Sequence, residues 1–250
     1  MKLIIAFFLF GALETLFPLK PKQKRFRQGW LTDITHFFIN HLFVKLGSYI
    51  IIVVLYILFH PLVSSSLQEG VASQPSWLQF IEACLIAELS FYIIHRLAHT
   101  LPWLWNFHII HHSSTELDWL ASVRFHPLEI IIANLAVGMP LFLLGFPKET
   151  FGHYLIFGAI LTLFNHANTS LRVPVLRWII ATPEFHHWHH SKEQVAHNKN
   201  FSGFPLIDLL FGTFYLPKKK MPSNYGVDEF IPKTYWGQIL YPIKIKQEPK

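Results

Sequence analysis

Long apolar runs separated by short polar segments dominate this chain. A membrane helix needs ~20 mostly apolar residues, and four runs reach or approach that length: residues 46–63, 77–94, 129–146 and 150–164. Only a few residues separate the last two runs, so we expect them to form a hairpin of two helices. The pattern predicts an all-α fold, a multi-pass membrane helical bundle with about four transmembrane helices.

A fifth apolar run, residues 3–16, is short for a membrane span. It could be a fifth, N-terminal span, an interfacial helix or the apolar part of a signal peptide. The signal peptide is the least favoured of the three. No small-residue cleavage site follows the run, and the next residues, "PLKPKQKRFR", are basic.

The composition also favours a membrane protein. Hydrophobic residues make up 52% of the chain and charged residues only 14%, whereas an ordinary soluble domain has ~25% charged residues. The net charge of +6 could suggest nucleic acid, but the basic residues flank apolar runs. We therefore expect anionic lipid headgroups as partners, and no nucleic acid. The single cysteine, Cys84, excludes a disulfide framework and a thiolate metal site.

The distribution of lysine and arginine predicts the orientation. Segment 18–30 holds five of them and segment 165–250 eleven, whereas the loop 61–76 holds none. If both helix pairs enter from the cytoplasm, 18 of the 21 basic residues lie on that side, as the positive-inside rule favours. This arrangement suits a bacterial inner membrane or the endoplasmic reticulum.

Three histidine clusters fall on the same predicted cytoplasmic side, in "HRLAH", "HIIHH" and "HHWHH". Their i, i+3 and i+4 spacings put side chains on one face of a helix. The residues on these faces are His95, His99, His108, His111, His112, His186, His189 and His190. His187 points away from the arc of the third cluster, and Trp188 faces the opposite side.

Eight imidazoles at repeated one-face spacing are hard to explain by packing, because buried imidazoles without partners are penalised. They also exceed the needs of one tetrahedral zinc site, so the pattern predicts two metal ions in a histidine-rich cap. Imidazole suits iron, copper, zinc and nickel, so the residues alone do not choose the metal. His166 in "FNHANTS" is a ninth candidate ligand, while for His126 in "RFHPLE" a hydrogen-bonding role at a turn is about as favoured as ligation.

A carboxylate lies on the same helical stripe as the first cluster. Glu88, Tyr92, His95 and His99 are spaced at i, i+4, i+7 and i+11. An ionisable residue inside an apolar helix is costly and usually functional, so we expect Glu88 to orient a ligating imidazole. A protonated or hydrogen-bonded core residue is the alternative.

The chain resembles the fatty acid hydroxylase and sterol desaturase superfamily of membrane-bound non-haem di-iron enzymes. The resemblance covers roughly residues 30–217 and rests on "HRLAH", "WNFHIIHHSS", "RFHPLE", "NHANTS", "TPEFHHWHHSK" and "LIDLLFGTFYLP", in that order. It implies that the eight clustered histidines and His166 are metal ligands. Glu88, His126, His187 and Asp208 are then candidates for supporting the ligands or for ligation. Many relatives have aspartate where this chain has Glu88, and arginine where it has His187.

The resemblance further implies two iron ions, with zinc as a substitute, that use O2 and two electrons to hydroxylate or desaturate a C–H bond of a sterol, fatty acyl or related lipid. Nothing resembles a fused cytochrome b5 domain, so we expect a separate electron donor: a reductase, a ferredoxin or a cytochrome b5-type carrier. The expected organisation is an N-terminal helix and basic loop at 1–30, a catalytic domain at 31–217 and an extended basic tail at 218–250.

Two rival readings remain. A non-catalytic membrane protein that binds or transports metals would line a path through the bilayer with histidines, whereas here they gather at one face. A bis-histidine haem protein needs facing pairs, and for that the H-x-x-H-H triplets are superfluous.

Overall fold

The computed structural model describes residues 2–218 and 220–244. Four long helices form the body: α2 (Trp30–Phe59), α4 (Ser76–Thr100), α6 (Pro127–Leu143) and α7 (Lys148–His166). Shorter α-helices are α1 (Lys2–Leu16), α3 (Ser65–Ala72), α5 (Pro102–His112), α8 (Pro183–His189), α9 (Pro205–Leu210) and α10 (Tyr235–Lys244). Single 3₁₀ turns are η1 (His60–Leu62), η2 (Trp119–Val123), η3 (Leu176–Trp178) and η4 (Gln194–Ala196). The described residues form no β-strand beyond two isolated bridges, so the predicted all-α class is confirmed.

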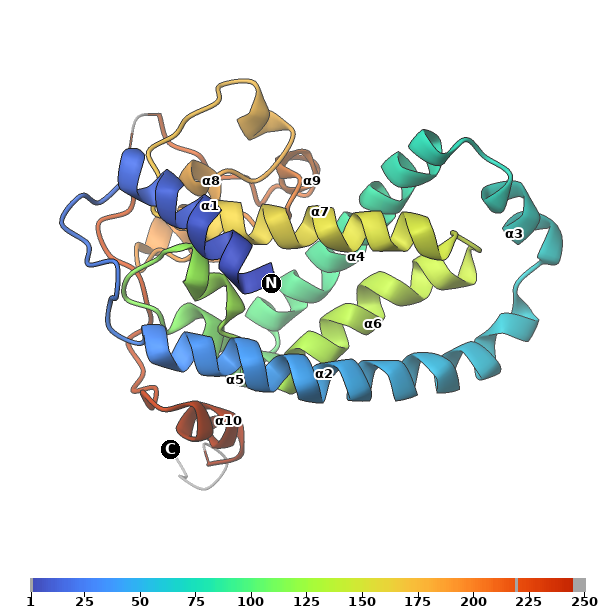
Figure 1. Cartoon of the computed structure of the whole chain (residues 1–250), viewed down its shortest axis with the longest axis horizontal. Helices are drawn as coiled ribbons and strands as arrows, with labels where there is room; N and C mark the ends of the chain where they lie inside the picture. Colours follow the sequence, from blue (N-terminus) through green and yellow to red (C-terminus); the bar gives the residue numbers. More distant parts are fainter. Residues whose placement is uncertain (1, 219, 245–250) are drawn as a thin grey trace.

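The molecule has two ends of different character. Figure 1 shows α8 at one end of the long helices and α3 at the other. The end with α8 holds the irregular segments between residues 167 and 234, and we call it the cap. The other end holds η1, α3 and the turn between α6 and α7. The two predicted helix pairs therefore appear as two helical hairpins with their connections at the end away from the cap.

Two helices are long and apolar enough to cross a membrane. They run over Trp30–Leu62 and Ser76–Thr100, with mean hydropathies of 2.4 and 1.5. The helices at the other two predicted spans are shorter, at 17 and 19 residues for α6 and α7. Large apolar side chains on α2 lie on its outer surface, among them Leu42, Leu46 and Ile57, as expected for a helix in contact with lipid. The number of spans stays a prediction.

The α2 helix begins much earlier than its apolar run, which starts at residue 46. Its first turns carry Asp33, His36 and Asn40, and all three are buried. Asp33 accepts hydrogen bonds from Arg27 (2.7 Å) and Arg124 (2.5 Å). Because each polar group finds a partner, the helix can continue into the protein interior. The apolar run, which begins at residue 46, could not include these turns.

The connection 61–76 between the first two predicted spans contains the helix α3. One expectation, the extended C-terminal tail, was wrong. The tail after residue 217 is not extended throughout, because α10 packs against α2 and α5. Gln238 of α10 lies 2.7 Å from Nε2 of His36, and Tyr235 donates to Asn40 at 3.0 Å. These polar contacts explain why the tail folds back onto the helical body.

The central helix α4 sets the position of the site. Ala83 and Ala87 are fully buried and pack with Val137 and Leu141 of α6 and with Tyr154 of α7. Small side chains let neighbouring helices approach closely. Since α4 is fixed between α6 and α7, its last turns carry the first histidine cluster into the cap.

Candidate metal centre

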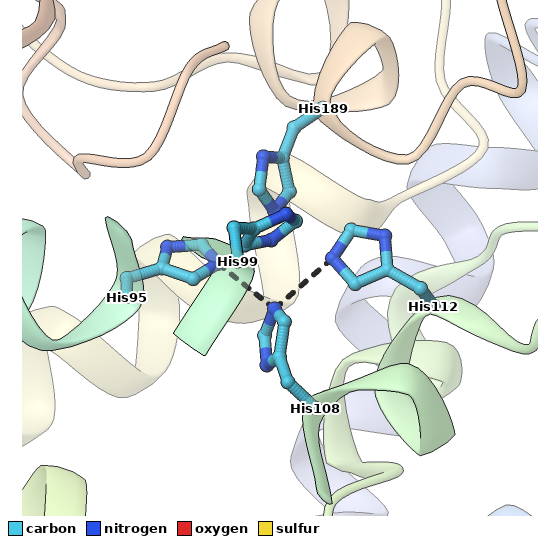
Figure 2. A group of neighbouring side chains, drawn as sticks. All are labelled: His95, His99, His108, His112 and His189. Carbon is cyan, nitrogen blue, oxygen red and sulfur yellow. Dashed lines mark hydrogen bonds between the residues drawn. The ribbon is translucent and has the colours of Figure 1, made fainter. Parts of the chain in front are cut away.

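Five histidines from three helices face a common point, and we call them group one. His95 and His99 come from the end of α4, His108 and His112 from α5, and His189 from α8. One ring nitrogen of each lies within 4.8 Å of the others. Figure 2 shows the rings directed inward, with dashed lines joining Nε2 of His108 to Nε2 of His95 (3.1 Å) and of His112 (3.0 Å).

Four more histidines form group two, again within 4.8 Å of one another: His111, His166, His186 and His190. Nε2 of His166 lies 3.2 Å from Nε2 of His111, of His186 and of His190. The two groups are neighbours, because the rings of His112 and His190 stack with centroids 4.4 Å apart. The nine residues of both groups are the nine candidate ligands of the sequence.

Backbone carbonyls fix the tautomers of these rings. Nδ1 of His95 donates to the carbonyl oxygen of Phe201 at 2.6 Å, and Nδ1 of His189 donates to that of Lys199 at 2.8 Å. In group two, Nδ1 of His166 lies 2.8 Å from the carbonyl oxygen of Thr162. A carbonyl only accepts, so the proton sits on Nδ1 and each Nε2 presents a lone pair to the group.

The donor set fits divalent transition metals. Nε2 atoms that each present a lone pair at 3.0–3.2 Å repel one another unless a cation lies between them. A cation with metal–nitrogen bonds of ~2.1 Å separates its ligand nitrogens by about 3.0–3.4 Å. In addition, Nε2 of His99 and of His189 are buried without a hydrogen-bond partner among the described residues. A metal ion in each group would remove the repulsion between the Nε2 atoms, and the ion in group one would also give Nε2 of His99 and of His189 a partner.

Burial keeps these imidazoles neutral. It is the main cause that lowers the pKa of the histidines on α5 and around α8 well below the ordinary value of 6.5, and neighbouring imidazoles lower it further. A neutral imidazole is the form that binds a metal. The cap therefore presents ligands that need not lose a proton at neutral pH.

His187 lies outside both groups. Its Nε2 donates to the carbonyl oxygen of His166 at 3.2 Å, and its Nδ1 accepts from the hydroxyl of Tyr225 at 2.8 Å. Burial lowers the pKa of His187 to about 4, so the ring is neutral. Trp188 points to yet another side and packs edge-on against Tyr215.

His126 is the N-cap of α6. Its Nδ1 accepts from the backbone N–H of Leu128 at 3.1 Å, and its Nε2 lies 3.2 Å from the carbonyl oxygen of Ile239. Both ring nitrogens are thus engaged by backbone groups, which corresponds to the turn role rather than to ligation.

Glu88 and Asp208 act on one loop instead of touching an imidazole. Asp208 accepts from the backbone N–H groups of Phe201 (2.8 Å) and Ser202 (2.9 Å). Glu88 accepts from the backbone N–H of Gly203 at 2.9 Å, and a Cβ added at Gly203 would lie 2.5 Å from that carboxylate. The loop in turn provides the Phe201 carbonyl that holds His95. Glu88 therefore does not contact a candidate ligand directly, as the sequence had suggested. It supports the loop whose Phe201 carbonyl holds His95.

One carboxylate at the site was missed by the sequence reasoning. Oε1 of Glu129 lies 2.5 Å from Nδ1 of His108, and Oε2 is buried without a partner among the described residues. Glu129 stands at the start of an apolar run, inside "RFHPLE". The same rule that singled out Glu88, a carboxylate at an apolar helix near a histidine cluster, could have found it.

An apolar cavity of about 330 Å³ borders both groups. Its histidine wall includes His95 and His108 of group one and His111, His166 and His186 of group two. The remaining lining is mostly apolar and comes from α4, α6 and α7, for example Phe91, Ile130, Ala133, Val137 and Leu155. The cavity thus runs from the histidines into the bundle between α4, α6 and α7.

The fold and the histidine groups define a class, and comparison with known proteins gives its name. The sequence model of the fatty acid hydroxylase family matches residues 80–213, which include all nine grouped histidines. The chain belongs to the fatty acid hydroxylase family, as the resemblance in its motifs indicated.

Curated relatives are named for lipid oxidation. The chain is 34% identical over 174 residues to ornithine lipid hydroxylase OlsE of Rhizobium tropici, covering 69% of this chain and 52% of the relative. It is 27% identical over 166 residues to human alkylglycerol monooxygenase, covering 66% of this chain and 35% of the relative. The chain therefore spans about half or less of the length of these relatives. No solved structure matches it.

Proposed function

We propose that this chain is an O2-dependent membrane oxidoreductase that hydroxylates a C–H bond of a lipid, with two iron ions held by the nine histidines. The observation that carries the proposal is the cavity that both histidine groups line together. A lipid chain seated there would bring a C–H bond next to both metal positions. The names of the relatives, a hydroxylase and a monooxygenase, favour hydroxylation over desaturation.

Group one would hold one iron ion and group two the other. When bound, the two irons would activate O2 with the two electrons delivered to them, a reaction that side chains alone do not carry out. The carbonyl oxygens of Phe201 and Lys199 and the carboxylate of Glu129 keep the imidazoles oriented. The apolar lining excludes water and seats the substrate.

The overall reaction balances with a separate electron donor. A lipid RH, O2, two electrons and two protons give ROH and one water. Desaturation with the same oxidant and reductant would give an alkene and two waters. We infer that the electrons come from a carrier or reductase outside this chain, and that the cap faces the cytoplasm.

Two rivals are less well supported. A transport path would be expected to extend along the helices, whereas both groups gather at the cap end of α4 and α7. A haem between two imidazoles is disfavoured by the Nε2–Nε2 distances of 3.0–3.2 Å, which leave no room for a macrocycle.

Lipid mass spectrometry tests the proposal. Host cells that express the chain under ¹⁸O₂ should accumulate a lipid that has gained one labelled oxygen, while cells that express His189→Ala at equal membrane levels should not. A lipid that has lost two hydrogens instead would identify a desaturase. Unchanged lipids, together with metal bound at full occupancy, would favour the metal-binding alternative.

A further inference from the structure

A polar groove lies at the surface of the cap, apart from the apolar cavity. A groove of about 770 Å³ is lined by Lys20, Lys22, Glu116, Lys192, Tyr225 and Asp228, among others. It shares no lining residue with the apolar cavity. The apolar cavity borders the histidine groups directly, whereas the lining of the polar groove includes none of the nine grouped histidines.

Tyr225 connects the floor of this groove to group two. Its hydroxyl donates to Nδ1 of His187 at 2.8 Å, and Nε2 of His187 donates to the carbonyl oxygen of His166 at 3.2 Å. His166 belongs to group two. Two hydrogen bonds thus join the groove to a proposed metal ligand, through side chains that are 3% and 1% exposed.

The local backbone holds this connection in place. Tyr225 forms an antiparallel bridge with Ser191, and the backbone N–H of Lys192 donates to the carbonyl oxygen of Asn224 at 3.1 Å. The groove floor is therefore paired directly with the end of the third histidine cluster. On the outer side, Nζ of Lys20 lies 3.9 Å from the centre of the Tyr225 ring.

The charge around the groove favours an acidic partner. Lys20 and Lys22 of segment 18–30 line one wall, and Lys24 of the same segment is exposed, whereas Arg27 is buried in ion pairs with Asp33 and Asp118. With Lys192, Glu116 and Asp228, the lining carries three lysines and two acidic residues. Lys22 is exposed on this wall, and Lys192 on another wall pairs with Asp228. Every residue that lines the groove carries a polar or charged group, which suits a protein surface better than a lipid chain.

We propose that this groove is the docking site of an acidic one-electron carrier protein, and that Tyr225 and His187 form the route by which its electrons reach group two. The inference rests on the proposed function, which requires an outside donor. In each turnover two reduced carriers would each lose one electron. With these two electrons and two protons from solvent, O2 would oxidise the lipid RH to ROH, and its second oxygen atom would leave as water.

Direct binding tests the docking surface without reference to turnover. Full-length protein in neutral-lipid nanodiscs is titrated with an acidic [2Fe–2S] ferredoxin at low and high salt. Lys22→Glu should weaken binding about ten-fold at low salt, and the difference should shrink at high salt. Lys148→Glu is the matched control, because Lys148 is exposed at the other end of the helical body and should leave binding unchanged. The docking site would be overturned if Lys22→Glu bound ferredoxin as tightly as Lys148→Glu. It would also be overturned if the protein bound ferredoxin in neutral nanodiscs but not in anionic ones, because that result would assign the groove to lipid headgroups.

Kinetics with two electron sources test the route. With ferredoxin, its reductase and NADPH, Lys22→Glu should raise the KM for ferredoxin, whereas Tyr225→Phe should lower kcat about ten-fold at unchanged KM. Single turnover with dithionite bypasses the carrier, so the ratio of ferredoxin-driven to dithionite-driven rates should fall ten-fold for Tyr225→Phe. An unchanged ratio would contradict the route. Absence of product with dithionite in the wild-type protein would instead contradict the proposed function.

Discussion

Oε1 of Glu129 lies 2.5 Å from Nδ1 of His108, and this contact joins the first turn of α6 to group one. The carboxylate fixes the ring so that Nε2 faces the other imidazoles. Groups that orient a metal-bound histidine commonly change metal affinity or activity by about 10–100-fold when they are removed.

We therefore predict that Glu129→Gln lowers hydroxylation and metal retention in group one by about 10–100-fold, and that Glu129→Ala lowers them at least as much. Metal content after dialysis and lipid product formation are the two measurements. Glu149→Gln, at an exposed carboxylate in the first turn of α7, is the control and should behave as wild type. Full metal retention in Glu129→Ala would show that the contact has no role in binding.

The third cluster, residues 186–190, holds three proposed ligands and His187, which lies outside both groups. We predict that His189→Ala leaves almost no activity, because it removes a proposed ligand of group one. His187→Ala should keep its metals and much of its single-turnover activity with dithionite, which bypasses the carrier, and His187→Arg more of it, as the family resemblance of the motifs implies. The loss of a buried hydrogen-bonded ring in His187→Ala should still cost about 1–3 kcal/mol of stability. If His187→Ala loses metal as completely as His189→Ala, the assignment of this cluster is wrong.

Asp208 stabilises the loop that carries the Phe201 carbonyl. It accepts from two backbone N–H groups and from the Thr213 hydroxyl at 2.7 Å. Asp208→Ala leaves these buried donors without a partner, at a cost of about 1–3 kcal/mol each. We predict a lower thermal midpoint in detergent and weaker metal binding in group one than in group two. Glu229→Ala, at an exposed position, should change neither. Equal loss from both groups would show that the loop supports the whole cap and not His95 in particular.

The topology can be tested by cysteine labelling in a Cys84→Ser background. Gly70 in α3 has open space around it, and Lys233 is exposed in the C-terminal segment. In intact cells or spheroplasts, an impermeant maleimide should label Gly70→Cys but should reach Lys233→Cys only after lysis. Labelling of both before lysis would contradict the predicted cytoplasmic orientation of the cap.

The sequence predicted the parts of this site that depend on local helical periodicity. The spacing of the clusters grouped His186, His189 and His190 on one side and put His187 elsewhere, as in the structure. It could not tell which histidines from different clusters share a group, because that depends on how α4, α5 and α8 meet. Nor could it reveal the carbonyls of Phe201 and Lys199, since every residue has a carbonyl and only tertiary packing selects these two.

The same distinction explains the errors in the fold. Apolar runs located the long helices well where exposed apolar side chains dominate, as on α2. They missed the first turns of α2, which carry the polar residues Asp33, His36 and Asn40. The hydrogen-bond partners of these residues are Arg27, which is close in sequence, and residues more than 80 positions away. They missed α10 because its stability depends on partners such as His36. Polar groups paired across long sequence separations leave no periodic signal.

The most direct test of the account is the metal stoichiometry of anaerobically purified protein supplied with Fe²⁺. The wild-type chain should bind two irons, with zinc able to replace them because imidazole accepts both metals. His186→Ala should retain the ion of group one, and His99→Ala should retain the ion of group two, so that each variant binds one. A single metal or none in active wild-type protein would contradict the two-metal centre.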